Sequence, residues 1–263
     1  MLIIGEKLNS AILRVREAIQ SKDAAYVQTL ARRQAETGAH YLDLNTSMAD
    51  DETADMEWLV RTVQEVVDTP LCIDSTDART MARGLETMRG PGMINSITLE
   101  KNRLEGILPL VLDYGLPVIA LTTDDSGIPK TVEQRLQLTE KLVNLLARHN
   151  YNLEQLYIDP LVLPLAVNSN NALLFFQCLK EIKETYKVKT VSGLSNVSHS
   201  MPARKIINRY FLALCMHCGM DAAIMDTTDE KLSTAVLALD LLLGQDRFGR
   251  NYIKAHRANT LAD

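Results

Sequence analysis

The chain has 263 residues, of which 46% are hydrophobic and 23% charged, a balance typical of a globular protein with a sizeable core. Its formal net charge is −5, from 28 basic and 33 acidic residues, and no run of clustered lysines and arginines indicates a nucleic-acid surface. No apolar run approaches the roughly 20 residues of a membrane span, and the N-terminal sequence MLIIGEKLNS lacks the pattern of a signal peptide, so we expect a cytoplasmic protein without membrane contact.

Short apolar runs alternate along the chain with longer amphipathic stretches. Several of the apolar runs are continuous, which is typical of parallel strands covered on both faces. The predicted strands span residues 2–5, 40–45, 71–75, 92–96, 117–122, 155–159, 188–194 and 222–226.

Helical periodicity fills the segments between these runs. Thr131 with Gln134 and Thr227 with Glu230 form candidate capping boxes before the fifth and the last of these helices, and Gly244 is a typical stop signal after the last. The predicted helices span residues 24–37, 54–67, 77–88, 102–114, 132–148, 170–185, 203–218 and 229–243.

Eight strand–helix units in a chain of this length have the size and rhythm of a (β/α)8 barrel, also called a TIM barrel. The structural alternative is a doubly wound sheet, which usually carries a G-x-G-x-x-G loop after its first strand, whereas here the first strand leads into GEKLN at 5–9. No linker, low-complexity segment or short repeat divides the sequence. We therefore predict an α/β fold with a single domain over residues 1–263.

Polar residues stand at the end of nearly every predicted strand, and in a barrel these ends meet at the C-terminal rim, where active sites are built. Turns and helix caps explain any one of them. Several, however, lie within apolar runs, where a carboxylate must be paired or bound to something. The candidates are Glu6, Asn9, Asp43, Asn45, Asp74, Ser75, Asn95, Ser96, Thr122, Thr123, Asp159, Ser195, Asn196 and Asp226.

The mixture of carboxylates and amides indicates the kind of ligand. Few lysines and arginines accompany them, which disfavours a phosphate-rich ligand. No cysteine and histidine cluster has zinc spacing, and no G-x-S-x-G nucleophile motif occurs; Cys215 and Cys218 are expected to be structural. A carboxylate-bound Mg²⁺ is an alternative, but the interleaved amides favour a neutral, hydrogen-bonding ligand and no metal.

Six of these strand-end segments, in this order, resemble the pterin-binding methyltransferase family and, within it, the methyltetrahydrofolate:corrinoid protein methyltransferases. They are GEKLN (5–9), LDLN (42–45), IDS (73–75), MINS (93–96), YIDPLVLP (157–164) and GLSNVS (193–198). The resemblance covers residues from about 1 to 245. It implies a (β/α)8 barrel that binds a tetrahydrofolate and moves the N5 methyl group to or from the Co(I) corrinoid of a partner protein. It also implies a homodimer.

By this resemblance, Asp74, Asn95 and Asp159 bind the edge of the pterin ring. That edge carries a 2-amino group beside a ring N–H, two donors that suit a carboxylate, and a carbonyl that suits an amide donor. The resemblance also assigns to Asn196 the catalytic hydrogen bond to the N5 region. An amide is not an acid, so the proton for N5 must come from water, from a solvent network or from a carboxylic acid with a raised pKa.

The resemblance places four more residues near the ligand. Gly193 and Leu194 are expected to end the seventh strand, with Gly193 letting the backbone approach the ligand and Ser195 lying on the rim. Arg204 either contacts the ligand or bonds locally at a helix start. At His199 the sequence departs from the family pattern, where glutamine stands; a histidine either titrates near neutral pH or replaces the glutamine as a hydrogen-bonding group.

Two other functions fit the same fold. A dihydropteroate synthase shares the pterin pocket, but its TPDSF-like segment and its late basic phosphate motif are absent from the sequence. A non-catalytic pterin- or folate-binding module would gain little from an asparagine directed at N5, so Asn196 argues against it. The direction of methyl transfer and the identity of the corrinoid protein are not readable from the sequence.

Overall fold

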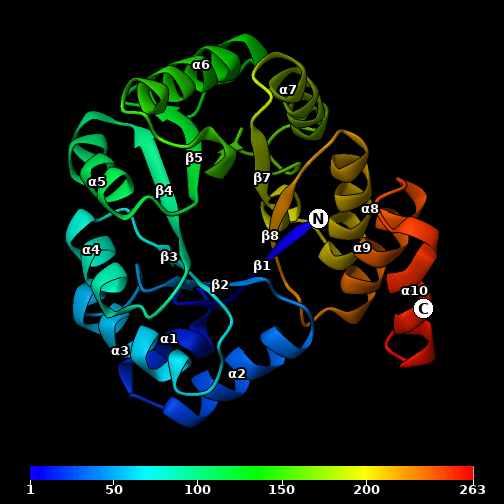
Figure 1. Cartoon of the computed structure of the whole chain (residues 1–263), viewed down its shortest axis with the longest axis horizontal. Coiled ribbons are helices and arrows are strands. Elements are labelled where there is room, and N and C mark those ends of the chain that lie inside the picture. Colours follow the sequence, from blue (N-terminus) through cyan, green and yellow to red (C-terminus); the bar gives the residue numbers. More distant parts are fainter. Residues whose placement is uncertain (263) are drawn as a thin grey trace.

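The strands pair in chain order into a closed barrel of eight parallel strands, with helices around it (Figure 1). The computed structural model describes residues 1–262. The elements are β1 (Leu2–Asn9), α1 (Leu13–Gln20), α2 (Ala24–Glu36), β2 (Tyr41–Asn45), α3 (Glu52–Gln64), β3 (Leu71–Asp74), α4 (Ala78–Thr87), β4 (Gly92–Leu99), α5 (Lys101–Tyr114), β5 (Val118–Asp124), α6 (Val132–Arg148), η1 (Leu153–Gln155), β6 (Leu156–Asp159), α7 (Asn171–Thr185), β7 (Lys189–Gly193), η2 (Leu194–Ser198), α8 (Arg204–His217), β8 (Ala222–Met225), α9 (Glu230–Leu242), η3 (Arg247–Gly249) and α10 (Arg250–Arg257).

Strand alternation decides which side chains fill the barrel and which pack against the helices. Outward residues such as Leu42, Leu44 and Ile73 belong to the large core between strands and helices. A separate apolar cluster fills the interior, formed by Ile4, Cys72, Met93, Ile119, Tyr157, Val191 and Ala222. Two residues further along β3, β4 and β6, the same alternation directs polar side chains into the mouth of the barrel.

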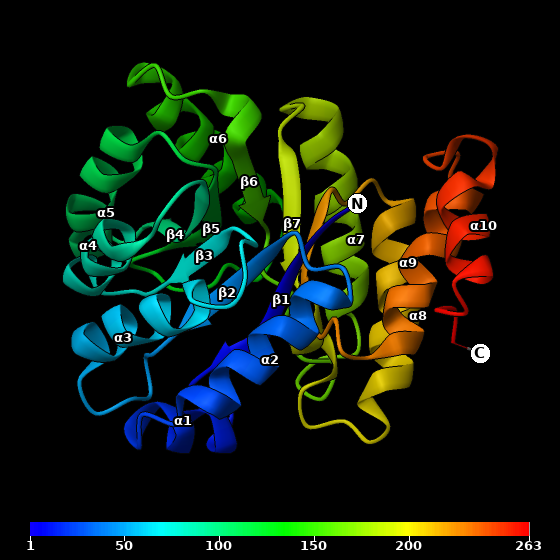
Figure 2. The ribbon, with the colours of Figure 1, turned by 60° about the horizontal axis from the view of Figure 1, so that its bottom comes forward.

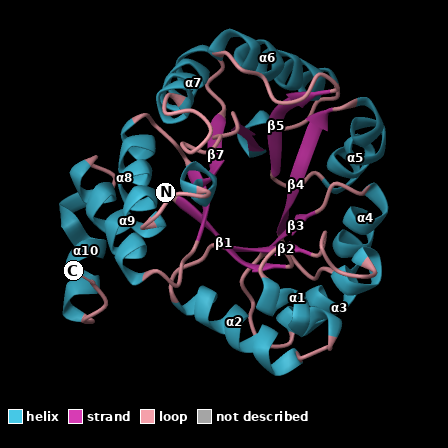
Figure 3. Ribbon diagram, turned by 180° about the vertical axis from the view of Figure 1, so that it is seen from behind, coloured by secondary structure: helices cyan, strands magenta, loops and turns pink. Residues whose placement is uncertain are grey.

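The last helix, α10, lies outside the ring of helices and packs against α9 (Figures 2 and 3). The backbone N–H of Ala262 donates to Thr234 Oγ1 on α9 at 2.8 Å, which ties the end of the described chain to this helix. Among the helices of residues 1–262, none combines the length and apolar character needed to cross a membrane.

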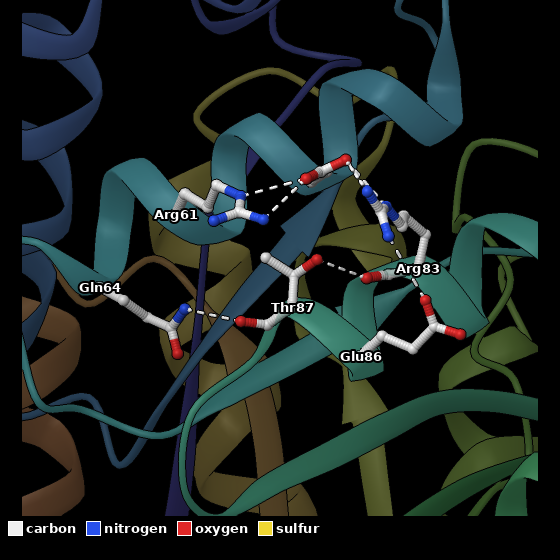
Figure 4. A network of polar contacts seen from close by, with 6 residues as sticks. Arg61, Gln64, Arg83, Glu86 and Thr87 are labelled. Carbon is white, nitrogen blue, oxygen red and sulfur yellow. Dashed lines mark hydrogen bonds and ion pairs between the residues drawn. The ribbon is translucent and has the colours of Figure 1, made fainter.

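Helices α3 and α4, which flank β3, are joined by a surface network of polar contacts (Figure 4). Glu57 accepts hydrogen bonds from Arg61 Nη2 at 2.9 Å and from Arg83 Nε at 2.8 Å, while Gln64 Nε2 donates to the Thr87 carbonyl at 3.4 Å. Exposed ion pairs of this kind contribute little to stability. The network's clearer effect is to fix how the two helices lie behind the strand that carries Asp74.

The predicted fold is confirmed, and all eight predicted strands are present. Three of them run further than expected: β1 to Asn9, β4 to Leu99 and β5 to Asp124. Their last residues are polar or irregularly paired, so the apolar run ends before the strand does. The prediction that Leu194 ends the seventh strand is wrong, because β7 ends at Gly193 and Leu194 begins η2.

The helix predictions differ from the structure at the ends of the chain. Two short helices, α1 and α10, were not predicted. The capping box of Thr131 and Gln134 is confirmed at the start of α6. The one assigned to Thr227 and Glu230 is wrong, because Asp229 caps α9 by accepting the Leu232 N–H.

Candidate active site

Four polar side chains on β2, β3 and β4 form one hydrogen-bonded cluster at the mouth of the barrel. The register places Asn45 beside Asp74 and Asp74 beside Asn95. Asn45 Nδ2 donates to Asp74 Oδ2 at 2.8 Å, and Asn95 Nδ2 donates to Asp43 Oδ1 at 3.1 Å. The Asn45 amide thus donates to a carboxylate on the neighbouring strand, and the Asn95 amide donates to one two strands away.

Burial controls the protonation of this cluster. It raises the pKa of Asp74 to about 6, although the Asn45 hydrogen bond lowers it. The pKa of Asp43 lies well above its usual range, first because the side chain is only 2% exposed and then because the charge of Asp74 repels a second charge. Two neighbouring buried carboxyls do not readily ionise together. Burial therefore favours a proton within this pair of carboxyls.

Asp159 ends β6 on the far side of the mouth and is 5% exposed. Its two carboxylate oxygens accept the backbone N–H groups of Leu161 at 2.7 Å and Gly193 at 3.4 Å. Burial raises its pKa to about 6, while these two hydrogen bonds and the charge of Arg135 lower it. Asp159 thus links the ends of β6 and β7.

A bulge in β1 places two charged residues at the mouth where a regular strand would place one. Gly5 and Leu8 both pair with outward residues of β2, Leu42 and Leu44, so Glu6 and Lys7 together stand opposite the single residue Asp43.

Gln34 on α2 holds the bulge from outside. Its Oε1 accepts the Lys7 N–H at 2.9 Å. The same oxygen would lie only 2.6 Å from a Cβ at Gly5, so the close approach of α2 to β1 requires glycine there.

The two residues of the bulge have separate partners. Ser195 Oγ donates to Glu6 Oε2 at 3.1 Å, and Lys7 Nζ forms an ion pair with Asp226 Oδ2 at 2.7 Å. Burial raises the pKa of Glu6 and outweighs the nearby charge of Lys7. Burial also raises the pKa of Asp226, but the hydrogen bonds from Lys7 and Thr228 outweigh it, and the pKa is lowered.

Asn196 lies in η2, immediately after β7, with an exposed side chain. Its amide covers Gly193, where a Cβ would lie 2.9 Å from Asn196 Nδ2. A side chain at this position would therefore have to displace the amide, while the close approach of a ligand that the sequence suggested stays a prediction.

Two predicted residues further along this segment are less central. Arg204 bonds locally: its Nη2 donates to the Ser195 carbonyl at 2.8 Å and its Nε to Ser198 Oγ at 3.1 Å. The His199 side chain is exposed, and its backbone N–H donates to the Asn196 carbonyl at 3.1 Å. Arg204 thus braces η2, which carries Ser195 and Asn196.

Asn9, at the end of β1, uses its Oδ1 to accept the Ala11 N–H at 2.8 Å and so stabilises the turn that follows. The structure brings ten of the other predicted residues to one rim, in three groups. These are Asp43, Asn45, Asp74 and Asn95; Asp159 with Gly193, Ser195 and Asn196; and Glu6 with Asp226.

Basic residues at the rim were missed from the sequence. Lys7 was read only as part of a strand end, because the bulge that turns it to the mouth has no signal in the alternation. Arg103 lies near enough to Asp74 for its charge to lower that pKa. It also lines an open cavity of about 410 Å³ beside the rim, together with Glu100, Asn102, Asp124, Asp125 and Gly127.

Known proteins resemble this chain over most of its length. Residues 12–226 match the model of a family described as pterin binding enzyme. The chain is 41% identical over 261 residues to the methylcorrinoid:tetrahydrofolate methyltransferase of Eubacterium limosum, covering 98% of this chain and 96% of that protein. It is 31% identical to the methionine synthase of Mycobacterium leprae over 86% of this chain, but this match spans only 20% of the synthase.

Solved structures show the same fold. A dihydropteroate synthase from Xanthomonas albilineans superposes with a TM-score of 0.70, covering 94% of each chain at 14% identity. A likeness at this identity concerns the fold alone. The matched family model and the full-length relative confirm the resemblance seen in the sequence, and the chain belongs to the pterin binding enzyme family.

Proposed function

We propose that this protein transfers a methyl group between N5 of a tetrahydrofolate and the corrinoid of a partner protein. The observation that carries the proposal is the Asn196 amide, set over Gly193 at a rim lined by Asp74, Asn95 and Asp159. The Eubacterium limosum relative, whose name states a methylcorrinoid:tetrahydrofolate methyltransferase, supports it at 41% identity over nearly the whole chain.

The rim has the chemistry that a pterin requires. Asp74 uses Oδ2 to accept from Asn45. A carboxylate can accept several hydrogen bonds and suits the paired 2-amino and ring N–H donors of a pterin. Asn95 on the neighbouring strand β4 provides an amide, and Asp159 at the end of β6 provides a second carboxylate. In this proposal these three residues bind and orient the ring.

Asn196 acts where the methyl group is exchanged. N5 is a poor leaving group unless it is protonated or strongly hydrogen-bonded as the carbon–nitrogen bond breaks. An amide donor placed there stabilises the transition state by about 2–4 kcal/mol. The side chain is exposed in the middle of η2, so it is accessible to a ligand, and Arg204 hydrogen-bonds the residue on the N-terminal side of it.

The other substrate is the corrinoid of a second protein, which docks over the open rim and supplies or accepts the methyl group at cobalt. The relative's name puts the methyl group on the corrinoid at the start of its reaction. The same groups serve both directions, because each direction passes through the same transition state. The cytoplasmic location expected from the sequence stays a prediction.

We also propose a homodimer, as the resemblance implies. Helix α8 presents an apolar stripe at a spacing of four residues: Ile206 is 55% exposed, Tyr210 68% and Leu214 51%. Large apolar side chains on one exposed helix face mark protein interfaces more often than isolated ones do. A second copy of the chain that packs on this stripe would cover it.

A single assay tests the proposed reaction. The purified protein is mixed with methyltetrahydrofolate and free cobalamin in the Co(I) state, and methylcobalamin is followed by its absorbance. We expect methylcobalamin to form, and Asn196→Ala to slow it about 10²-fold or more while weakening folate binding. Binding of tetrahydrofolate without any methylcobalamin would instead favour a binding module, and an unchanged rate in Asn196→Ala would contradict the role of the amide.

A further inference from the structure

The proposed reaction needs a proton that Asn196 cannot supply. When the methyl group leaves N5, the electron pair of the carbon–nitrogen bond stays on nitrogen, which ends the reaction carrying a hydrogen. In the reverse direction that hydrogen has to be removed. An acid–base group within reach of N5 is therefore required, and it has to be stable in both protonation states.

Five rim carboxyls are candidates, and their partners distinguish them. Backbone N–H groups and amide N–H groups only donate, so they stabilise the ionised form of a carboxyl. Asp159 has backbone donors on both oxygens, while Asp43 and Asp74 each accept from an asparagine amide. Asp226 is held as a carboxylate by Lys7.

Glu6 differs because its partner is the hydroxyl of Ser195, at 3.1 Å from Oε2. A hydroxyl donates to a carboxylate and accepts from a carboxylic acid, so this contact survives a change in protonation. Within residues 1–262 the second oxygen of Glu6 has no hydrogen bond, and the side chain is partly exposed at the mouth. Ser195 is the direct chain neighbour of Asn196, so the hydrogen bond ties Glu6 to the segment that carries the group assigned to N5.

We propose that Glu6 is the carboxylic acid that gives a proton to N5 when the methyl group leaves the folate, and that takes it back in the reverse direction. This inference rests on the proposed function. In the forward direction the methyl carbon accepts an electron pair from Co(I), the carbon–nitrogen pair stays on N5, and the proton passes from Glu6 to N5. Co(I) becomes methyl-Co(III), and the Glu6 carboxylate regains a proton from solvent.

The surroundings of Glu6 suit this role. Burial raises its pKa, as an acid that works near neutral pH requires, while Lys7 and Arg204 oppose the rise with positive charge. Asp226, the residue after β8, faces Glu6 with negative charge, and a charge on Glu6 in turn raises the pKa of Asp43 on β2. The β1 bulge fixes the position, since it directs Glu6 to Ser195 and Lys7 to Asp226.

The test is the pH dependence of methylcobalamin formation from methyltetrahydrofolate and Co(I) cobalamin, between about pH 5.5 and 8.5, with saturating folate. For the unaltered protein we expect the rate to fall as pH rises through the titration of Glu6. Glu6→Gln keeps a partner for Ser195 but carries no transferable proton. We expect it to lower the rate at pH 6 about 10²-fold and to flatten the profile, while tetrahydrofolate binding changes less than about threefold.

Two further variants separate an acid–base role from a structural one. Lys7→Met removes a charge that lowers the pKa of Glu6, so the midpoint of the profile should move to higher pH. Glu36→Gln makes the same chemical change as Glu6→Gln at an exposed position of α2 and should reproduce the unaltered profile.

The outcomes are distinguishable. A Glu6→Gln protein that keeps the rate and profile of the unaltered protein overturns the assignment. So does a Lys7→Met protein whose midpoint stays in place while Glu6→Gln is slow, because Glu6 would then act only through packing. If the unaltered protein binds tetrahydrofolate but forms no methylcobalamin, the proposed function fails, and the role of Glu6 fails with it.

Discussion

The Asn196 amide lies against Gly193 so closely that a Cβ at Gly193 would be 2.9 Å from Asn196 Nδ2 and 3.7 Å from its Cγ. Gly193 itself has φ −70°, which alanine also adopts, so the glycine is not needed for backbone conformation. One methyl group at position 193 therefore competes for space with the amide and for little else. A substitution at Gly193 therefore tests whether methyl transfer depends on the position of the Asn196 amide.

We expect Gly193→Ala to slow methyl transfer about 10²-fold, because the displaced amide no longer reaches N5. The unfolding free energy should change by less than about 1 kcal/mol, since alanine is compatible with the backbone. The measurement is the rate of methylcobalamin formation, with urea unfolding beside it. In an Asn196→Ala background the same substitution should have no further effect on rate, whereas additive losses would show that Gly193 acts independently of the amide.

A second prediction concerns Asp74, whose pKa is raised from 3.8 to about 6 by burial. A carboxyl with a raised pKa destabilises the folded protein once it ionises, so stability is lost as pH rises from about 4 to about 6 and stays lost above that. Asp74→Asn removes the charge, keeps an oxygen for Asn45, and relieves the repulsion on Asp43. We expect it to raise the unfolding free energy at pH 7.5 by about 1–3 kcal/mol while weakening tetrahydrofolate binding.

Urea unfolding at two pH values tests this explanation. At pH 4.5 the original Asp74 is largely protonated in the folded protein, so the advantage of Asp74→Asn should shrink. An advantage of equal size at pH 4.5 and pH 7.5 would show that it does not arise from the ionisation of Asp74. If Asp74→Asn stabilises the protein and weakens tetrahydrofolate binding, the Asp74 carboxylate serves ligand binding and lowers the stability of the fold.

His199 provides a third prediction. Its side chain is exposed, and the interaction that fixes the segment is its backbone N–H bonded to the Asn196 carbonyl, which any residue can make. We therefore expect His199→Gln to keep the shape of the pH profile of methyl transfer. A profile that becomes flat between about pH 6 and 8 would instead put a titrating histidine in the proton path and would compete with the role proposed for Glu6.

The apolar stripe of α8 leads to a fourth prediction. Replacing Tyr210 and Leu214 together by arginine places two charges in the proposed contact between copies. We expect the mass measured by light scattering to fall from that of a dimer to that of a single chain. Leu173→Arg, at an apolar side chain on α7 that is 65% exposed, is the matched control and should leave a dimer. A dimer that survives the double change would place the interface elsewhere.

The sequence was informative wherever one physical pattern governs an element. The continuous apolar runs predicted every strand, because parallel strands are buried on both faces. The carboxylates and amides within those runs, such as Asp74, Asn95 and Asp159, predicted which residues would share a rim. The structure places them there because two-residue alternation continues from the apolar interior to the mouth.

What the sequence did not predict depends on contacts between distant segments. The bulge of β1 is stabilised by Gln34 on α2, which accepts the Lys7 N–H and packs closely against Gly5. The sequence GEKLN by itself does not predict the bulge. Lys7 was therefore missed and the strand was expected to end four residues early. In the same way, Asn196 lies against Gly193 because the chain folds into the short helix η2 directly after β7. The number of turn-forming residues in this segment does not predict that helix.

The hydrogen bonds from Asn45 to Asp74 and from Asn95 to Asp43 also restrict how this barrel can change over time. Each bond joins a donor to an acceptor in a place with little water, so altering one partner alone strands the other at a cost of about 1–3 kcal/mol. A substitution that abolishes either bond therefore needs a compensating substitution on the partner strand, whereas Asp74→Asn keeps the acceptor oxygen and does not. We expect the sequence at the mouth of this barrel to change slowly during evolution, through coupled substitutions, whereas residues of the outer helices change independently.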